Sequence, residues 1–482
     1  MAGAALPFGL APFDFWILTL AAPAVLFWRV AWSAPSEAAV LGWWFGLGKY
    51  AVGASWVYVS IHDYGGASPL LAGALVALFC AALAFFPALS TWFFMRYLVR
   101  DSHVRDAIAF AASFVLLEWI MTWVLTGFPW LFLGYGHLGT YLGNFAPIGG
   151  VLAVSLAAAL SGCLVAAALQ TRRNTERIAA VVLAAVPWAG GWALGRHEWV
   201  AETEHATVAL VQGNIAQSAK WQPDSVMPIL ATYRDLSEAA WGRDVVVWPE
   251  AAVTLFAEQA RPYLDTMAER ATRAGSALVL GIPDVERMPD SPPLYLNTAI
   301  AIGLGDGQYV KRRLVPFGEY VPFERLLRGL IAFFDLPMSR AVAGAEQQEP
   351  LTLKSWRAAM AICYEVVYPE LVRQSAKDAD VLITISNDTW FGRSFGPLQH
   401  MEMAQMRALE NGRWLLRATN DGVTAIVDAR GHVVKSLPRF EPGVLTGEFS
   451  IMNGYTPFTR FGTLPVVLLL GALAFVGRTQ RG

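Results

Sequence analysis

The chain has 482 residues and a formal net charge of −2, with 55% hydrophobic and only 15% charged residues. Typical soluble proteins contain about 25% charged residues, so this composition indicates a membrane protein, with a length that suits about two or three domains. A net charge near zero provides no basic field for nucleic acid, and we expect no nucleic-acid partner. Two of the three cysteines lie inside long apolar runs, which argues against a disulfide framework.

Apolar runs long enough to cross a bilayer stand on both sides of a long polar block, residues 201–455. We therefore predict three regions. Residues 1–200 form an N-terminal transmembrane helix bundle, residues 201–455 a catalytic domain, and residues 456–482 a C-terminal transmembrane helix with a short cytoplasmic tail. The runs are residues 13–32, 38–61, 69–97, 107–125, 145–169, 178–194 and 461–476.

The basic residues near these runs predict the orientation of the chain. Arg29 lies near the end of the first run, and further arginines cluster at residues 96–105 and 172–177 and occur again at the C-terminus. The loops at residues 62–68 and 126–144 contain neither Lys nor Arg. Because loops rich in Lys and Arg stay in the cytoplasm, residues 201–455 are expected on the outer face, which is the periplasmic side of a bacterial inner membrane.

Short β-rich runs alternate with helical stretches in the polar block. This alternation predicts an α/β layered domain, and the continuous apolar strands predict sheets covered on both faces. The expected strands are residues 207–211, 245–248, 277–281, 298–302, 358–362, 381–386, 415–419 and 424–428. The expected helices are residues 227–242, 261–274, 369–377 and 399–411.

Three reactive side chains are predicted to stand at strand ends. Glu250 follows a buried strand and Pro249, Lys311 follows a second strand, and Cys363 follows a run of small apolar residues. A carboxylate can act as general base for a thiol, and an ammonium can stabilise a thiolate and then an oxyanion. Taken singly, Cys363 is better interpreted as a buried structural cysteine, and Glu250 and Lys311 as surface charges. Together they favour a covalent acyl intermediate on Cys363.

Rival catalytic motifs are absent from the sequence. It contains no G-x-S-x-G nucleophile turn, no H-E-x-x-H zinc helix and no Walker A loop, so no metal or cofactor is expected. The seven histidines form no pair at metal-ligand spacing, and His400 is interpreted as a helix-surface or pocket residue. The lack of a candidate histidine base strengthens the assignment of Glu250.

The order of the motifs resembles a known family. The segments WPE, K-x-x-L-V-P-F-G-E and C-Y-E resemble the Glu-Lys-Cys triad of the nitrilase, or carbon–nitrogen hydrolase, superfamily. With helices on both sides, the chain resembles the bacterial apolipoprotein N-acyltransferases. The likeness extends to QGNIAQSAKW at residues 212–221, ISNDTWFG at 385–392, GPLQHMEMAQMRALENGRWLLRATNDG at 396–422 and WVLTGFPWL at 123–131.

This resemblance implies an αββα catalytic sandwich and a two-step reaction. Cys363 would take an acyl chain from a phospholipid, typically phosphatidylethanolamine, and pass it to the α-amine of diacylglyceryl-cysteine on an apolipoprotein. Glu250 would be the base and Lys311 the oxyanion stabiliser. Supporting or substrate-binding roles are implied for Glu319, Tyr364, Glu365, Trp221, Asn387, Trp390 and Phe391. The family also has a further apolar helix before the segment at residues 11–16, so seven to eight transmembrane helices are expected.

A thioester facing the periplasm hydrolyses unless water is excluded, which favours a transferase with a lipid-accessible cleft. The apolar stretch at residues 326–338, Trp221 and residues 390–391 are expected to line that cleft, although residues 326–338 also fit an internal core helix. One alternative is a membrane-anchored amidase that hydrolyses a C–N substrate. Another is a transporter or scaffold, which Lys49 and Glu118, as isolated charges in apolar runs, support poorly.

Overall fold

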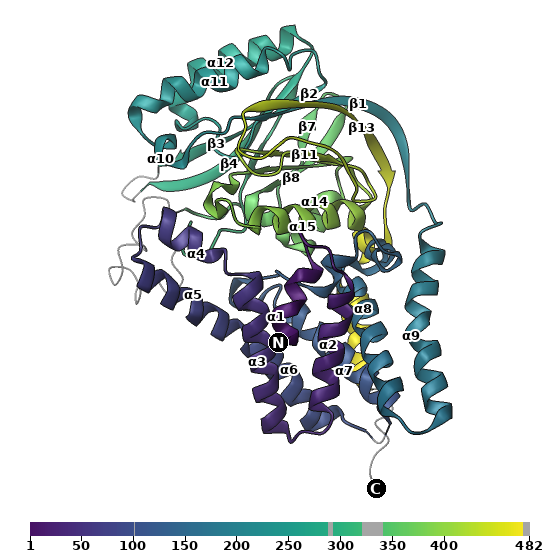
Figure 1. Ribbon diagram of the computed structural model, residues 1–482. Coiled ribbons are helices and arrows are strands. Elements are labelled where there is room, and N and C mark those ends of the chain that lie inside the picture. The colour runs from purple at the N-terminus through teal and green to yellow at the C-terminus, as the bar shows by residue number, and fades with distance from the viewer. Residues whose placement is uncertain (101, 288–292, 321–340, 476–482) are drawn as a thin grey trace.

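The computed structural model describes residues 1–100, 102–287, 293–320 and 341–475. Helices form the part of the chain before residue 200, and two β-sheets with helices on their outer faces form the main body of the chain after it (Figure 1). The expected cleft segment at residues 326–338 lies outside the described residues. The N-terminal helices are α1 (Ala2–Ala5), η1 (Leu6–Gly9), α2 (Ile17–Val30), α3 (Pro35–Gly53), α4 (Val57–Val59), η2 (Ser60–Tyr64), α5 (Pro69–Leu83), α6 (Phe85–Phe93), η3 (Phe94–Leu98), α7 (His103–Ile120), η4 (Val124–Thr126), η5 (Leu133–His137), η6 (Tyr141–Phe145), α8 (Ala146–Gln170) and α9 (Asn174–Leu194).

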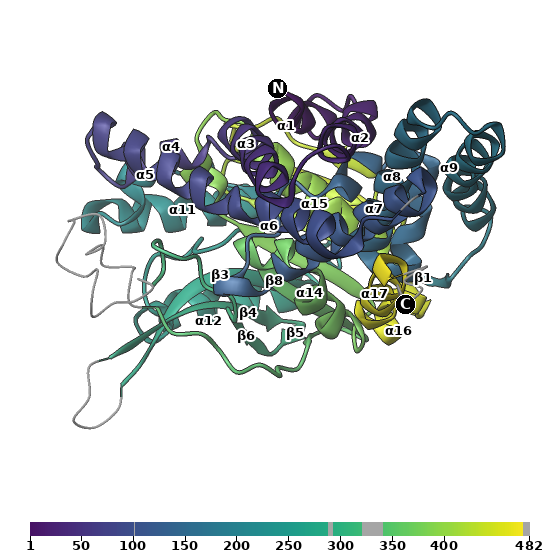
Figure 2. The ribbon, with the colours of Figure 1, turned by 90° about the horizontal axis from the view of Figure 1, so that it is seen from below.

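Three helical segments among the described residues are long and apolar enough to cross a membrane: Pro69–Leu98, Tyr141–Gln170 and Asn174–Leu194. Two shorter apolar helices, Ile17–Val30 and Leu464–Phe475, accompany them. The expected single run at residues 69–97 is divided into α5, α6 and η3. Seen from below, α9 lies at the periphery next to α8, and the C-terminal helix α17 (Leu464–Phe475) lies near α7 (Figure 2).

The strands form two sheets. The first has the order β13-β1-β2-β3-β4-β6, and the second has the order β12-β11-β10-β9-β8-β7-β5. The first sheet contains β1 (Val200–Gln212), β2 (Val245–Val247), β3 (Ala277–Glu286), β4 (Leu294–Gly303), β6 (Gln308–Val310) and β13 (Gly443–Gly454). The second contains β5 (Gly305–Asp306), β7 (Leu351–Leu353), β8 (Trp356–Ile362), β9 (Val381–Ser386), β10 (Leu415–Thr419), β11 (Ala425–Val427) and β12 (Val433–Ser436).

The two sheets pack face to face between two layers of helices, so the expected α/β sandwich is present (Figure 1). Apolar side chains from both sheets form the core between them. The outer face of the first sheet packs against α11 (Val226–Ser237) and α12 (Ala257–Arg273). The outer face of the second packs against α14 (Pro369–Ala376) and α15 (Gly396–Asn411). Burial on both faces explains why β9 has six consecutive buried residues.

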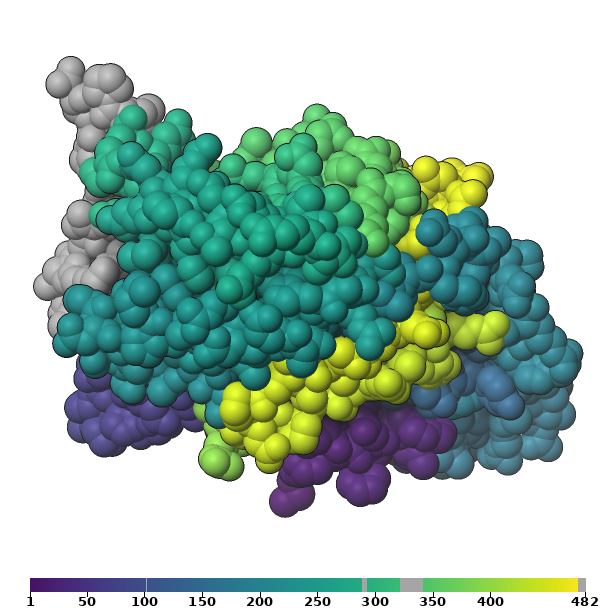
Figure 3. All heavy atoms as spheres, turned by 90° about the horizontal axis from the view of Figure 1, so that it is seen from above, coloured from purple at the N-terminus to yellow at the C-terminus, as the bar shows by residue number. Residues whose placement is uncertain are grey.

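The layer of α14 and α15 lies on the N-terminal helices, and both belong to one hydrophobic core. Glu410 of α15 is fully buried and accepts a hydrogen bond from the backbone N–H of Val151 in α8 (2.7 Å). That donor follows the non-helical backbone of Gly149 and Gly150 in α8. From above, parts of the N-terminal helices project from beneath the sandwich on several sides (Figure 3). The sandwich therefore sits on the helices through buried contacts.

Candidate active site

Cys363 occupies an unusual backbone position directly after β8. It begins the short helix η9 (Cys363–Val367) with a φ of 53°, in the left-handed region that residues other than glycine seldom adopt. Such a conformation costs about 1–3 kcal/mol and persists where surrounding contacts hold it. The turn leaves Cys363 in contact with the core between the two sheets, with 9% of its surface exposed.

The carboxylate of Glu365 joins the segment that contains Cys363 to the segment that contains Lys311. Its oxygens accept hydrogen bonds from backbone N–H groups on both segments and from one phenol. The donors are Ile362 N (2.8 Å), Arg312 N (2.6 Å), Arg313 N (3.1 Å) and the Tyr309 hydroxyl (3.0 Å). Burial raises the pKa of Glu365, and the N–H donors partly offset this effect.

Glu250 is buried and held on both carboxylate oxygens. Its Oε1 accepts from the side-chain amide of Asn297 (2.8 Å) and from Lys311 Nζ (3.3 Å), and its Oε2 accepts from the backbone N–H of Asn387 (2.8 Å). Burial acts to raise the pKa of Glu250, but Lys311 and the hydrogen bonds outweigh burial and lower it. Glu250 is therefore ionised at neutral pH.

Lys311 lies between two carboxylates. Its Nζ is 2.8 Å from Glu319 Oε1 and 3.3 Å from Glu250 Oε1, and the residue is 1% exposed. Burial acts to lower the pKa of Lys311, but Glu319 and Glu250 raise it well above its ordinary value. A protonated amine is thus fixed at this point, as a group that stabilises developing negative charge requires.

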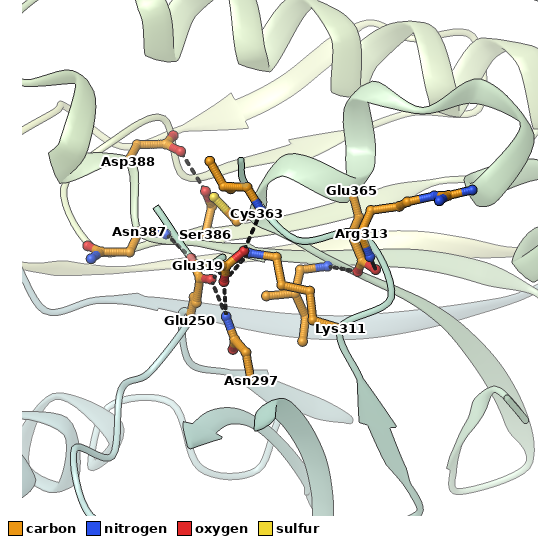
Figure 4. A network of polar contacts seen from close by, with 12 residues as sticks. Glu250, Asn297, Lys311, Arg313, Glu319, Cys363, Glu365, Ser386, Asn387 and Asp388 are labelled. Carbon is orange, nitrogen blue, oxygen red and sulfur yellow. Dashed lines mark hydrogen bonds and ion pairs between the residues drawn. The ribbon is translucent and has the colours of Figure 1, made fainter. Parts of the chain in front are cut away.

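The thiol of Cys363 lies beside this cluster and within hydrogen-bonding reach of Ser386 (Figure 4). Burial raises the pKa of Cys363, and the charge of Glu250 raises it further, against the smaller opposite effect of Lys311. The resting site accordingly combines a neutral thiol, an ionised carboxylate and an ammonium. Such a site needs a general base at the moment of attack, which is the role that Glu250 is positioned to perform.

A buried polar network stands behind the nucleophile. Ser386 donates to Asp388 Oδ1 (2.5 Å), and Arg417 donates to Asp388 Oδ2 (2.9 Å). His400 of α15 is 3.1 Å from Asp388 Oδ1 through Nδ1 and 3.1 Å from the carbonyl oxygen of Cys363 through Nε2. His400 is fully buried, so its interpretation as a helix-surface residue is wrong, while its place beside the site agrees with a pocket. Burial and Arg417 lower the pKa of His400.

Aromatic rings connect the site to the N-terminal helices. Trp130 stacks on Tyr364 and on His400, with ring centroids 6.4 Å and 5.9 Å apart, and donates to Gln399 Oε1 (2.6 Å). Phe391 packs against Trp56 (4.7 Å between centroids). The face of η9 opposite the carboxylate cluster is thereby closed by side chains of the helical region.

The remaining predicted residues lie on α10, on η10 and in the segments next to them. Asn387 donates to Gln217 on α10 (Gln217–Lys220), and Trp221 follows this helix with 41% of its surface exposed. Trp390 lies on η10 (Asp388–Phe391), and its carbonyl accepts from Ser60 on η2 (2.8 Å). Loops from both halves of the chain therefore meet at the predicted cleft residues.

Comparison with known families and proteins finds relatives that match nearly the whole chain. Residues 207–453 match the carbon-nitrogen hydrolase family, and residues 2–164 match the apolipoprotein N-acyltransferase N-terminal domain. The apolipoprotein N-acyltransferase of Pseudomonas aeruginosa is 46% identical over 486 residues, which cover 100% of this chain and 95% of the relative. The chain belongs to the apolipoprotein N-acyltransferase family. The enzymes of that name from Azotobacter vinelandii and Vibrio cholerae are 47% and 40% identical, covering 100% and 98% of this chain and 95% and 94% of the relatives.

Two solved structures match a little more than half of the chain. A carbon-nitrogen hydrolase from Helicobacter pylori is 15% identical, with a TM-score of 0.38 over 57% of this chain and 95% of that one. An amidase from Nesterenkonia sp. is 20% identical, with a TM-score of 0.36 over 56% of this chain and 97% of that one.

Sequence reasoning brought the acid, the amine and the thiol of this family member together but missed their neighbours. Asn297, Ser386 and Lys220 contact the three groups and were not singled out. Lys220 is 1% exposed, and its Nζ donates to the carbonyl oxygen of Glu250 (3.0 Å). Their positions in the sequence could have identified two of these residues. Ser386 ends an expected strand, and Lys220 precedes Trp221 in a segment that resembles the family.

Proposed function

We propose that this chain moves a fatty acyl group from a phospholipid to the N-terminal amine of a diacylglyceryl-modified lipoprotein, through a thioester on Cys363. Acyl transfer in lipoprotein maturation follows from membership of the family, since full-length relatives at 46% identity are named apolipoprotein N-acyltransferase. The donor, the thioester and the role of each residue belong to the proposal. The observation that supports them most is the cluster of Glu250, Lys311 and Glu319 beside a buried thiol.

In the first half-reaction, the sulfur of Cys363 attacks an ester carbonyl of the phospholipid while Glu250 accepts the thiol proton. Lys311 stabilises the negative charge that develops on the carbonyl oxygen. The ester C–O bond then breaks, and Glu250 returns its proton to the departing oxygen of the lysophospholipid. General-base assistance of this kind accelerates a step by about 10²–10⁴-fold.

In the second half-reaction, the neutral α-amine of the acceptor attacks the thioester. A C–N bond forms, the C–S bond breaks, and the proton released by the amine passes through Glu250 to the sulfur. Water competes with the amine for the thioester, so the aromatic closure around η9 favours transfer over hydrolysis.

The supporting residues are assigned roles from their contacts. Glu319 orients and charges Lys311, Glu365 joins the two reactive segments, and Asn387 positions Glu250 through its backbone N–H. Tyr364 anchors η9 on the helical region, since its hydroxyl lies 3.3 Å from the carbonyl oxygen of Gly127. Trp221, Trp390 and Phe391 line the entry for lipid.

The membrane topology is also part of the proposal. The alternation of basic loops supports a multi-pass protein of the bacterial inner membrane with residues 201–455 in the periplasm. Residues 1–200 and 456–482 would anchor it with seven to eight transmembrane helices. Phosphatidylethanolamine is the proposed acyl donor.

A transfer assay tests the proposal. Enzyme in phospholipid micelles receives a lipopeptide with an N-terminal diacylglyceryl-cysteine, and mass spectrometry records the N-acylated product. We expect Cys363→Ala to abolish product, Glu250→Gln to reduce its rate by about 10²–10⁴-fold, and Cys80→Ala, a buried cysteine of α5, to leave it unchanged. Release of free fatty acid or cleavage of a C–N substrate without lipopeptide acylation would instead support a hydrolase.

A further inference from the structure

A carboxylate outside the catalytic cluster stands at the same sheet edge as Cys363. Asp421 lies just beyond β10, and β8, β9 and β10 are parallel neighbours in the second sheet. Their carboxyl ends share one edge, so the end of β10 lies two strand spacings from the end of β8, about 10 Å. Asp421 is therefore within the reach of a substrate whose reacting atom is at the sulfur.

Asp421 is buried and incompletely paired. It is 6% exposed, and its Oδ1 has no hydrogen-bond partner within the described part of the chain. The nearby Thr389 hydroxyl donates to Asn387 Oδ1 (2.9 Å). Among the described residues no cation lies within the 4.0 Å of an ion pair with it. Burial raises the pKa of Asp421 to about 6, so the group is still mainly ionised at neutral pH. A buried anion with a free oxygen is costly unless a partner arrives.

The charged neighbours of Asp421 are Asp388, Lys220 and Arg439, and the two cations donate hydrogen bonds to other groups, although Arg439 Nε is buried without a partner among the described residues. Lys220 donates to the carbonyl oxygen of Glu250 (3.0 Å), and Arg439 donates to the carbonyl oxygen of Gly392 (2.9 Å). Both cations act on the pKa of Asp421 from a distance without forming an ion pair with it. The free oxygen is thus left for a ligand.

Asp421 lies beside two segments that contain predicted cleft residues. The preceding residue, Asn420, bonds to the segment that leads to Trp221, accepting from Asn214 N (2.7 Å) and Ile215 N (2.9 Å). On the other side, Thr389 belongs to η10, the helix that contains Trp390. Asp421 is therefore close in the fold to both the segment that leads to Trp221 and η10.

We infer that Asp421 is the binding site for a primary ammonium group of a substrate. A primary ammonium has three N–H donors and a positive charge, which match a buried carboxylate with a free oxygen. The inference rests on the proposed function, in which two substrates have such a group: the ethanolamine headgroup of the donor and the α-amine of the acceptor.

Variants that separate charge from shape test this inference. Asp421→Asn keeps the size of the side chain and removes its charge, Asp421→Glu keeps the charge, and Asp306→Asn changes an exposed carboxylate of β5 as a control. For each protein, Cys363 acylation is timed by intact mass with phosphatidylethanolamine and with phosphatidylglycerol, which lacks the ammonium. Discharge of the acylated enzyme is then timed against the concentration of the lipopeptide acceptor.

We expect Asp421→Asn to weaken either the preference for phosphatidylethanolamine or the binding of the lipopeptide by roughly tenfold to a hundredfold. Asp421→Glu should be less affected, and the control should be unchanged. A reduced preference for phosphatidylethanolamine over phosphatidylglycerol assigns the site to the headgroup. An unchanged acylation rate with a raised KM for the lipopeptide assigns it to the acceptor.

Changes below twofold in both measurements would overturn the inference, as would an equal loss with both phospholipids and an unaltered KM, which describes a structural role. The melting temperature of Asp421→Asn should not fall, because the change removes a buried charge without an ion partner. A wild-type enzyme that never acylates Cys363 would contradict the proposed function itself.

Discussion

At the residue scale, the protonation states of three side chains determine what the site can do. Burial raises the pKa of the Cys363 thiol, so its proton stays on sulfur until a carbonyl approaches. Glu250 remains ionised because Lys311 and hydrogen bonds overcome the effect of burial on its pKa. Lys311 remains protonated because Glu319 and Glu250 overcome the same effect. The site is thereby poised for base-assisted attack across a broad range of pH.

The pH dependence of the two half-reactions should differ. Glu250 acts as a base above its lowered pKa, and Lys311 acts as a cation below its raised pKa, so acylation of Cys363 should vary less than threefold between about pH 5.5 and 9. The acceptor amine attacks only when neutral, and its pKa is about 8, so transfer should rise about tenfold per unit below that value. Rapid-quench mass measurements of each step would check this. An acylation rate that climbs steadily from pH 6 to 9 would indicate a thiolate mechanism instead.

Lys220 provides a second test at this scale. Its Nζ donates to the carbonyl of Glu250, and its charge helps to lower the pKa of that carboxylate. In Lys220→Met we expect the acid limb of acylation to move to higher pH by about 1 unit, the size expected when a nearby opposite charge is removed. Lys220→Arg keeps the positive charge and should show little of this shift.

A rate loss in Lys220→Met that is equal at every pH would show that Lys220 only supports the fold. The KM for phospholipid serves as the control, because Lys220 contacts the base and should leave that constant within twofold.

At the scale of elements, the sequence predicts the strands next to the site well. It predicts the long pair of β1 with β13 poorly. β9 and β10 have the expected bounds because both faces are buried and the apolar runs are unbroken. β13 was not predicted, since its residues GVLTGEFSIMNG alternate irregularly and contain three glycines. β1 begins at Val200, earlier than the apolar run, because pairing with β13 extends the strand into exposed polar residues.

The same contrast holds for the site. Glu250, Lys311 and Cys363 could be found because each lies within three residues of the end of a strand, and strand ends are local features of a sequence. The pairs Ser386 with Cys363 and Arg417 with Asp388 each join a strand residue to a short helix elsewhere in the fold, and spacing along the chain does not encode them. The side-chain contacts of Trp130 with α15 join the two halves of the molecule and are equally invisible to local patterns.

Glu365→Gln should weaken the junction of η9 with the segment after β6. The amide retains one acceptor oxygen where the carboxylate serves several donors, and each buried donor left without a partner costs about 1–3 kcal/mol. We expect a lower melting temperature together with a slower acylation of Cys363. Glu349→Gln, at an exposed carboxylate, is the matched control. An unchanged melting temperature with full activity would contradict this role of Glu365.

At the scale of the whole molecule, the sandwich depends on the helices beneath it. The side of α14 and α15 that faces the N-terminal region is part of the same hydrophobic core as that region. Tyr368 reaches across this boundary to the carbonyl oxygen of Thr126 (3.0 Å). Removing the helices would expose an apolar face of a size that soluble proteins seldom tolerate.

Residues 201–455 expressed alone should therefore aggregate without detergent and should not acylate Cys363. Light scattering and intact mass of the isolated fragment, with the full chain in the same detergent as control, would check this. A monomeric, soluble fragment with hydrolytic activity would favour the amidase alternative.

The central claim is that Cys363 receives an acyl group from phospholipid and gives it to an amine. Intact-mass measurement of the full chain after incubation with phosphatidylethanolamine tests it most directly, with peptide mapping to locate the adduct. We expect a mass gain of one acyl group on Cys363, which disappears when an N-terminal cysteine lipopeptide is added and is absent in Cys363→Ala. Turnover of phospholipid and lipopeptide without any adduct on Cys363, or undiminished turnover in Cys363→Ala, would contradict it.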